Sequence, residues 1–172
     1  GAKRGLYLAE SYPDYFTGIA LPGIAYRQNS SDTEWLDVLQ RLSNLNNMNI
    51  YAEGDIIDTH TPYTYAKPIF EKLSEINEQF EYSITEFNRH KYFILLADIY
   101  AEKMASWERI KKPEKAYLKS YRRKTDRIHW IHDIKMDSKK YYFEIEAEIL
   151  NNKIIISGDN IKSFKIDIAN SP

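Results

Sequence analysis

The strongest structural signal in this sequence is a two-residue alternation near the carboxyl terminus. Between residues 143 and 149, apolar side chains alternate with glutamates: the apolar set is Phe143, Ile145, Ala147 and Ile149, and the acidic set is Glu144, Glu146 and Glu148. Because successive side chains of a β-strand point to opposite faces, this pattern predicts a strand with one apolar and one acidic face. We therefore expect the rest of the chain to pack against a sheet formed here.

Three further strands are predicted around this one. Residues 127–136 carry apolar side chains at alternate positions, and residues 153–157 form a β-branched run. Residues 163–168 alternate again, with Phe164, Ile166 and Ile168 on one face. Short connections between consecutive strands favour an antiparallel meander over residues 127–168.

Turn-forming residues separate these strands. They occur at residues 137–140, at 150–152 and at 157–160, where Gly158 is expected to adopt a left-handed conformation. Like charges directly across a ladder repel, so the glutamate row needs cationic partners. Lys153 and Lys165 are the predicted partners.

The first part of the chain mixes short strands and helices. Residues 5–10 and 48–57 are predicted strands, and residues 12–28 are rich in turn formers. A helix is expected after Ser31, whose hydroxyl forms a capping box with Glu34. Another helix is expected at Pro68, because the first helical turn tolerates proline.

The middle of the chain supplies the predicted covering layer. Residues 81–87 fit either a strand or a continued helix, and we favour the helix. The longest apolar stripe, over residues 91–109, predicts a helix buried under the sheet. Residues 114–124 predict a last, basic helix.

These elements predict an α+β fold in which N-terminal helices pack on one face of a C-terminal, four- to five-stranded antiparallel meander. Helices first and a curved sheet last is also the order of NTF2-like cone folds, an analogy that carries no function. We expect a single domain over residues 1–172, with a helical and mixed part in residues 1–125 and the meander in residues 127–168.

Composition excludes several classes of function. The chain has 172 residues, a net charge of −1 and no cysteine. A near-neutral chain has no global attraction for nucleic acid or anionic membranes, and disulfide or thiolate chemistry is excluded. No apolar run approaches the roughly 18 residues of a membrane span. The compartment is open: the cytoplasm is compatible with the sequence, and so is export after removal of a leader.

Tyrosine is abundant, with 14 residues. A tyrosine combines a flat apolar ring with a hydroxyl, which suits interfaces and sugar-like ligands. The competing explanation is compositional bias, because asparagine, isoleucine and lysine are abundant too. No motif specifies a reaction, so our leading hypothesis is a non-catalytic ligand-binding or assembly module with a tyrosine-rich pocket or face, whose partner is a small molecule or a protein.

A metal-dependent hydrolase is the alternative. Asp55, Asp58 and His60 follow a predicted strand and provide oxygen and imidazole ligands, which can hold a divalent metal and lower the pKa of a bound water. The Gly54-Asp55-x-x-Asp58 stretch resembles one block of the metallophosphoesterases, whose Asp-x-His and Gly-Asn-His blocks are absent here. The resemblance implies phosphoester cleavage, and glycan cleavage is also considered. The structural alternative is that both aspartates close turns.

Strand-end carboxylates give a second catalytic possibility. Glu10, Glu53 and Glu86 each follow an apolar stretch, and barrel enzymes keep their acid, base and nucleophile at the carboxyl ends of parallel strands. Paired carboxylates can cleave glycosides, which makes Glu53 and Glu86 catalytic candidates. The chain is too short to close an eight-unit barrel.

A basic run occupies residues 109–127. Its candidate contacts to nucleic acid or phosphate are Lys119, Arg122, Arg123 and Arg127, with tyrosines interleaved. Basic groups neutralise phosphates and aromatic rings stack on bases, so single-stranded nucleic acid is a possible partner. The alternative is a solvated helix face that pairs with the glutamate row. His132 lies on the apolar parity of its strand and is expected in the core.

Overall fold

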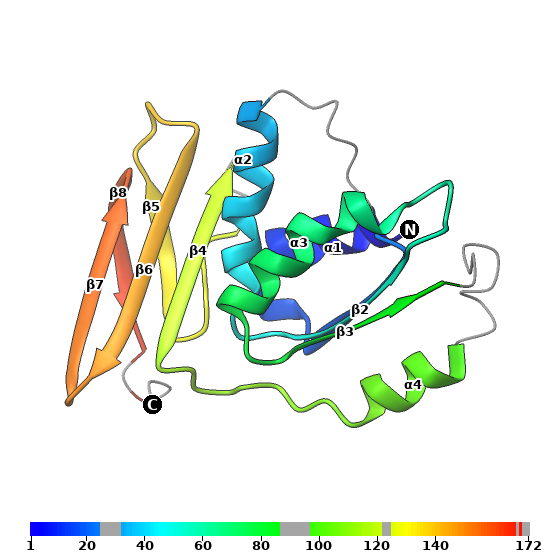
Figure 1. Cartoon of the computed structure of the whole chain (residues 1–172). Coiled ribbons are helices and arrows are strands. Elements are labelled where there is room, and N and C mark those ends of the chain that lie inside the picture. The colour runs from blue at the N-terminus through cyan, green and yellow to red at the C-terminus, as the bar shows by residue number, and fades with distance from the viewer. Residues whose placement is uncertain (25–31, 87–96, 122–124, 168, 170–172) are drawn as a thin grey trace.

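The computed structural model describes residues 1–24, 32–86, 97–121, 125–167 and 169. Over these residues the chain is α+β, as predicted. A small parallel sheet with its helices occupies one half, and antiparallel strands occupy the other (Figure 1). In the described residues, no helix is long and apolar enough to cross a membrane.

Three parallel strands form the first sheet, in the order β1-β2-β3, with bounds Gly18–Pro22, Asn49–Asp55 and Phe80–Thr85. The register pairs Ile50 of β2 with Ile19 and with Phe80. Helices precede or connect the strands: α1 (Ala2–Ser11), α2 (Asp32–Arg41) and α3 (Tyr63–Ile76), with the 3-10 turns η1 (Pro13–Tyr15) and η2 (Leu42–Leu45). Parallel strands need such long crossovers, which antiparallel hairpins do not.

Strand β2 is buried along nearly its whole length, as the central strand of a parallel sheet should be. Its apolar face, with Ile50 and Ala52, packs into a core made with α1, η2 and α3. Its other face carries Tyr51 and Glu53, which contact Tyr100 of α4 (Ala97–Ala105). Helices α3 and α4 therefore lie on opposite sides of the sheet (Figure 1).

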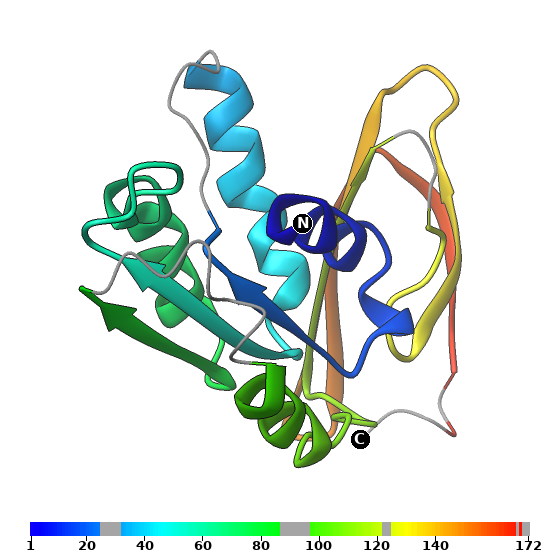
Figure 2. The same ribbon diagram turned by 90° about the vertical axis from the view of Figure 1, so that its right-hand side faces the viewer.

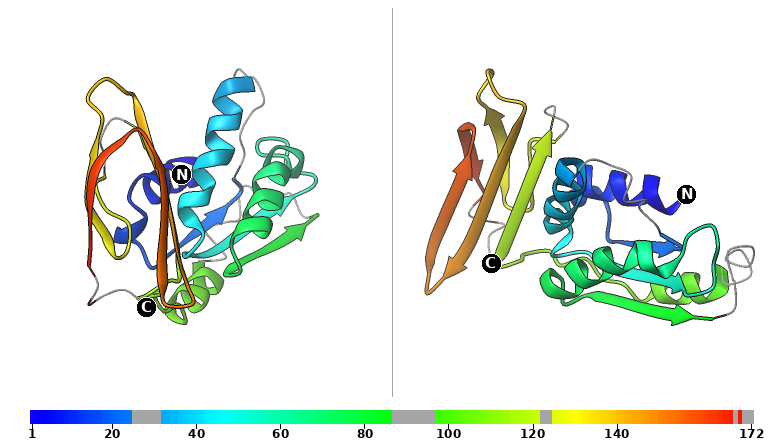
Figure 3. Two further views of the ribbon diagram at one scale, coloured as in Figure 1. Left: turned by 90° about the vertical axis from the view of Figure 1, so that its left-hand side faces the viewer. Right: turned by 45° about the horizontal axis from the view of Figure 1, so that its top comes forward.

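The antiparallel half contains β4 (Lys115–Tyr121), β5 (Ile131–Met136), β6 (Tyr142–Leu150), β7 (Lys153–Asp159) and β8 (Ile161–Ile166). Strands β4-β6-β7 form one sheet and β5-β8 a second. The two sheets face each other (Figure 3) around a core that includes Leu118, Trp130, Ile134, Phe143 and Ile145. The apolar row of β6 is thus buried as predicted, against β5 and β8.

The two halves meet where η2 contacts β4. Asn44 hydrogen-bonds both backbone groups of Lys119, and Asn47 donates to the Lys115 carbonyl at 2.7 Å. These side chains occupy part of the edge of β4 that does not pair with β6, so the Lys119 N–H and the carbonyls of Lys115 and Lys119 have partners there. Helix α2 runs beside β4, and α1 lies behind this contact (Figure 1, Figure 2).

The four predicted C-terminal strands exist, but the predicted meander is wrong. β6 pairs with β4 and β7, and β5 pairs with β8. The consecutive strands β5 and β6 therefore lie in different sheets, and so do β7 and β8. The prediction that residues 91–109 cover the apolar face is not confirmed: residues 87–96 lie outside the described part of the chain, and α4 contacts the parallel sheet instead.

Three secondary-structure predictions are wrong for identifiable reasons. Residues 114–124 contain the strand β4. Its buried Ala116, Leu118 and Ser120 recur at every second position, and the lysines between them obscured this two-residue period. Within the stretch 81–87, residues 81–85 belong to strand β3, because a parallel register with β2 stabilises the extended form. Residues 5–10 are helical, with Leu6, Ala9 and Glu10 buried at helical spacing.

Local details also differ from the prediction. Helix α3 starts five residues before Pro68, which lies inside it. Gly158 does not have a left-handed conformation; Asn160 does, with φ 59°. The cationic partners of the glutamate row come from β4: Lys115 lies 3.0 Å from Glu148, and Lys119 lies 3.7 Å from Glu144. Ser31, the expected helix cap, and Ile168 lie outside the described residues.

Candidate functional site

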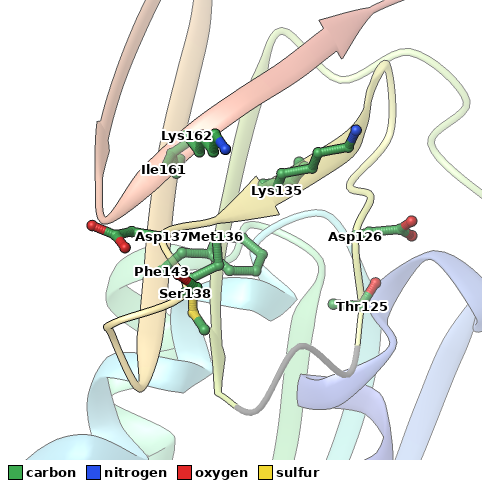
Figure 4. A pocket seen from close by; sticks show the side chains of 10 residues that line it. Thr125, Asp126, Lys135, Met136, Asp137, Ser138, Phe143, Ile161 and Lys162 are labelled. Carbon is green, nitrogen blue, oxygen red and sulfur yellow. The ribbon is translucent and has the colours of Figure 1, made fainter.

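A hollow lined by described residues opens at one end of the antiparallel half. Its volume is about 730 Å³, and its lining comes from β5, β6, β8 and the segment before β5. The lining residues are Thr125, Asp126, Ile134, Lys135, Met136, Asp137, Ser138, Phe143, Ile161 and Lys162. Figure 4 shows Met136 and Phe143 close together, with Thr125 and Asp126 on a separate segment. We call this space the sandwich hollow.

The floor of the sandwich hollow is apolar. Phe143 and Ile134 belong to the buried core, and Met136 and Ile161 pack against it. Met136 pairs with Ile161 across the β5-β8 ladder, which brings their side chains to one end of the sheet. The predicted turn at residues 137–140 then carries the chain from β5 to the start of β6, where Phe143 is the second residue.

The rim of the sandwich hollow carries two lysines and two aspartates: Lys135, Lys162, Asp126 and Asp137. Lys135 and Lys162 are exposed, and no carboxylate among the described residues pairs with either. Asp137 closes its turn: its Oδ1 accepts the Lys139 N–H at 3.0 Å. The two lysines extend from neighbouring strands, so their positive charges repel each other. A bound anion would reduce this repulsion.

The polar part of this lining consists of hydroxyl, carboxylate and ammonium groups. The described lining residues include no histidine, cysteine or tyrosine, and the hydroxyls are those of Thr125 and Ser138. Three tyrosines lie elsewhere, on β4 and β6, and others lie around the parallel sheet. On β4 and β6, the rings of Tyr121 and Tyr142 lie 5.7 Å apart, and Tyr117 donates to Glu144 at 2.8 Å.

Two of the predicted metal ligands, Asp55 and Asp58, accept hydrogen bonds from groups of the protein itself. Asp55 accepts the Ile57 N–H at 3.0 Å and the Thr85 hydroxyl at 3.1 Å. The side chain of Asp58 is fully buried; its Oδ1 accepts the backbone N–H groups of His60 and Thr61, and its Oδ2 accepts the Thr61 hydroxyl at 2.6 Å. The described residues include no group of three or more histidine and acidic side chains that could hold a metal ion.

The predicted catalytic carboxylates are dispersed. Glu53 is 4% exposed and accepts hydrogen bonds from Tyr51 at 3.1 Å and Tyr100 at 2.7 Å, whereas Glu86 is exposed after the end of β3. Burial, followed by the charge of Glu53, raises the pKa of Tyr51 to about 12. Glu10 lies in α1, not at a strand end.

Glu10 is a buried acid at the junction of the two halves. Its Oε2 lies 3.3 Å from Arg41 Nε, and its Oε1 has no hydrogen-bond partner in the described residues. Burial raises the pKa of Glu10 to about 7, although the nearby Arg41 opposes the shift. Arg41 also pairs with Asp37, which accepts the Tyr121 hydroxyl.

The described residues of the basic run do not form a continuous patch. Lys119 is mostly buried, between Gln40 and Glu144, so its charge is neutralised within the fold. Arg127 pairs with Asp14 at 3.4 Å, on another part of the surface. Arg122 and Arg123 lie outside the described residues. His132 is partly exposed and lines a smaller hollow, in contrast to the predicted core position.

No protein-family model, curated protein or solved structure matches this chain. Sequence reasoning did not identify the sandwich hollow, because its residues converge only through the pairing of β5 with β8. The available signal was the pair of lysines, each next to a core-facing residue.

Proposed function

We propose that this protein is a non-catalytic binding module whose ligand is a small amphipathic anion held in the sandwich hollow. The observation that carries the proposal is the pair of exposed lysines, Lys135 and Lys162, which have no ion-pair partner among the described residues and lie above a floor that includes Phe143. A hollow of about 730 Å³ falls within the roughly 300–1,000 Å³ range of small-molecule sites. The floor favours an apolar body of the ligand, and the lysines favour a carboxylate or sulfonate at its end.

A fluorescent probe of this chemistry tests the proposal directly. Anilinonaphthalene sulfonate combines fused aromatic rings with one sulfonate, and its emission rises when water is excluded. We expect saturable, one-to-one binding to the native protein. Lys135→Gln and Lys162→Gln should each weaken binding several-fold, because each removes a favourable charge interaction. Met136→Trp should weaken it further by filling the hollow.

Two control variants separate this site from other apolar surface. Lys139→Gln removes a cation from the adjacent turn, outside the lining, and should leave probe affinity unchanged. Ile155→Thr removes a half-exposed isoleucine from β7 and should also have no effect. Loss of binding in the Ile155 variant with no change in the lysine variants would place the probe on β7 and refute the proposal.

A further inference from the structure

A second hollow, of about 340 Å³, lies at the junction of the two halves. Its lining comes from η1, from the segment between α4 and β4, from the approach to β5 and its start, and from Asp167 after β8. The lining residues are Asp14, Tyr15, Arg109, Ile110, Lys111, Arg127, His129, His132 and Asp167. We call this space the junction hollow. It shares no lining residue with the sandwich hollow.

Asp14 organises the wall of the junction hollow. Both of its carboxylate oxygens accept the His129 N–H at 3.0 Å, and its Oδ2 lies 3.4 Å from Arg127 Nε. The guanidinium of Arg109 donates to the Asp14 carbonyl. The negative charge of Asp14 is therefore used to fix the surrounding donors in place.

His129 is held in an uncommon conformation. Its φ of 50° lies in the left-handed region, which costs a non-glycine residue roughly 1–2 kcal/mol. The bond from its N–H to Asp14 holds it there. The Asn47 side-chain amide lies 3.4 Å from Nε2, and Asp14 lies 3.7 Å from Nδ1. Burial lowers the pKa of His129, so the ring is a neutral wall of the hollow.

This conformation explains why both histidines line one hollow. Opposite parity would separate His129 and His132 on a straight strand, but β5 begins only at Ile131, after the left-handed residue. His132 remains partly exposed within the lining. The histidines thus add polar ring atoms beside the cations.

Three permanent cations face this space. Lys111 and Arg109 have no carboxylate partner in the described part of the chain, and Arg127 uses only Nε toward Asp14. The η nitrogens of Arg127 are thus available to a ligand. Arginine forks match the geometry of oxyanions, and charge-assisted hydrogen bonds to them are about twice as strong as neutral ones.

We propose that the junction hollow binds a phosphate group, either as inorganic phosphate or at the end of a small organic molecule. The cations come from two separate segments, residues 109–111 and the approach to β5, and converge on one compact space, which suits a single phosphate. A nucleic-acid backbone would need a continuous row of cations, and Lys119 is already neutralised by Glu144.

Calorimetric titration at low salt and near-neutral pH tests this site with inorganic phosphate, glucose 6-phosphate and glucose. We expect saturable phosphate binding that weakens as salt increases. Arg127→Gln should lower the affinity at least tenfold, because it removes charge-assisted hydrogen bonds. Arg4→Gln makes the same charge change on the exposed face of α1 and should alter the affinity less than twofold.

The comparison of ligands identifies the source of the phosphate. Tighter binding of glucose 6-phosphate than of inorganic phosphate, with no binding of glucose, supports a phosphorylated organic ligand; equal binding supports inorganic phosphate. Absence of saturable binding, or equal losses in the Arg127 and Arg4 variants, would overturn the proposal. So would a single-stranded oligonucleotide that binds more tightly and is not displaced by phosphate.

Asp14 provides an independent test of how the site is built. If charge alone determined affinity, Asp14→Ala would tighten phosphate binding, because it removes a nearby negative charge. If Asp14 positions Arg127 and His129, the same variant should weaken binding. Circular dichroism and thermal melting confirm that the variant is folded. Tighter binding in a folded Asp14→Ala protein would contradict the proposed architecture of the site.

Discussion

The side-chain amide of Asn44 hydrogen-bonds both backbone groups of Lys119: its Oδ1 accepts the Lys119 N–H at 2.7 Å, and its Nδ2 donates to the Lys119 carbonyl at 2.9 Å. The same Nδ2 donates to the Glu10 carbonyl at 2.7 Å. One buried side chain therefore joins α1, η2 and β4. The contact between the two halves depends on it more than on any surface ion pair, since exposed pairs contribute little.

Asn44→Ala should destabilise the protein by about 3 kcal/mol, because it leaves buried backbone groups without partners. Urea denaturation measures this loss. Asn47→Ala is the matched control: its bond to the Lys115 carbonyl lies in a more exposed part of the same contact, so water can replace it. Its cost should stay below about 1 kcal/mol. Equal costs for the two variants would show that Asn44 has no special role.

Glu10 makes stability depend on pH. Burial raises its pKa from an ordinary 4.5 to about 7 in the folded protein. A raised folded-state pKa stabilises the protein while the group is protonated, so this contribution is present below about pH 4.5 and is lost as the pH rises through about 7.

Glu10→Gln should therefore match the wild type at pH 4.5 and be more stable at pH 8, by an amount on the order of 3 kcal/mol or less. The glutamine keeps an acceptor for Arg41, which also retains Asp37. Denaturation at a series of pH values measures the difference. A constant difference across this range would mean that Glu10 does not titrate between the two values.

Asp58 should behave as a structural residue, not as a metal ligand. Asp58→Ala removes the acceptor of two backbone N–H groups and of the Thr61 hydroxyl, and should cost about 2–4 kcal/mol. Mn²⁺ or Zn²⁺ should not raise the Tm of the wild type. A metal-dependent rise in Tm that disappears in Asp55→Ala would instead support the hydrolase hypothesis.

Glu53 should be detectable through its tyrosine neighbours. Burial and the Glu53 charge together raise the pKa of Tyr51 to about 12. Glu53→Gln removes the charge and leaves the burial, so the pKa of Tyr51 should fall part of the way toward 10. Ultraviolet difference titration or nuclear magnetic resonance of the phenol carbons measures the change. Tyr100→Phe, which keeps the charge, should leave the pKa of Tyr51 high.

Local patterns predicted the elements whose stability is local. The alternation at residues 143–149 correctly identified β6, and the asparagines at 151 and 152 both have positive φ in the predicted turn. Strand pairing was not predictable in this way. Ile145 pairs with Leu118 on one side and Gly158 on the other, and nothing in the adjacent sequence selects these partners.

The candidate site was harder to predict than the fold elements. Phe143 was correctly expected on an apolar face, but the hollow above it requires Ile161 to pair with Met136. The junction hollow depends on the positive φ of His129, which a strand pattern does not reveal. Site residues that converge through tertiary contacts leave little trace in sequence periodicity.

Gly18 and Gly5 offer a contrast that tests the packing of the segment after α4. A Cβ on Gly18 would lie 2.4 Å from Trp107 Cε3 and 2.6 Å from the Asn49 carbonyl oxygen, so Gly18→Ala must displace one of them. The carbonyl belongs to the paired strand β2 and cannot move easily. We expect a loss of about 1–3 kcal/mol from overpacking, with a shift in tryptophan emission as Trp107 moves toward water.

Gly5→Ala is the control. Its Cβ would lie at an ordinary 3.4 Å from the Ile19 side chain. Gly5 belongs to helix α1, where alanine is favoured over glycine by up to roughly 1 kcal/mol. It should therefore leave the protein as stable or more stable. A Gly18→Ala protein as stable as the wild type, with unchanged emission, would show that Trp107 does not pack against β1 in solution.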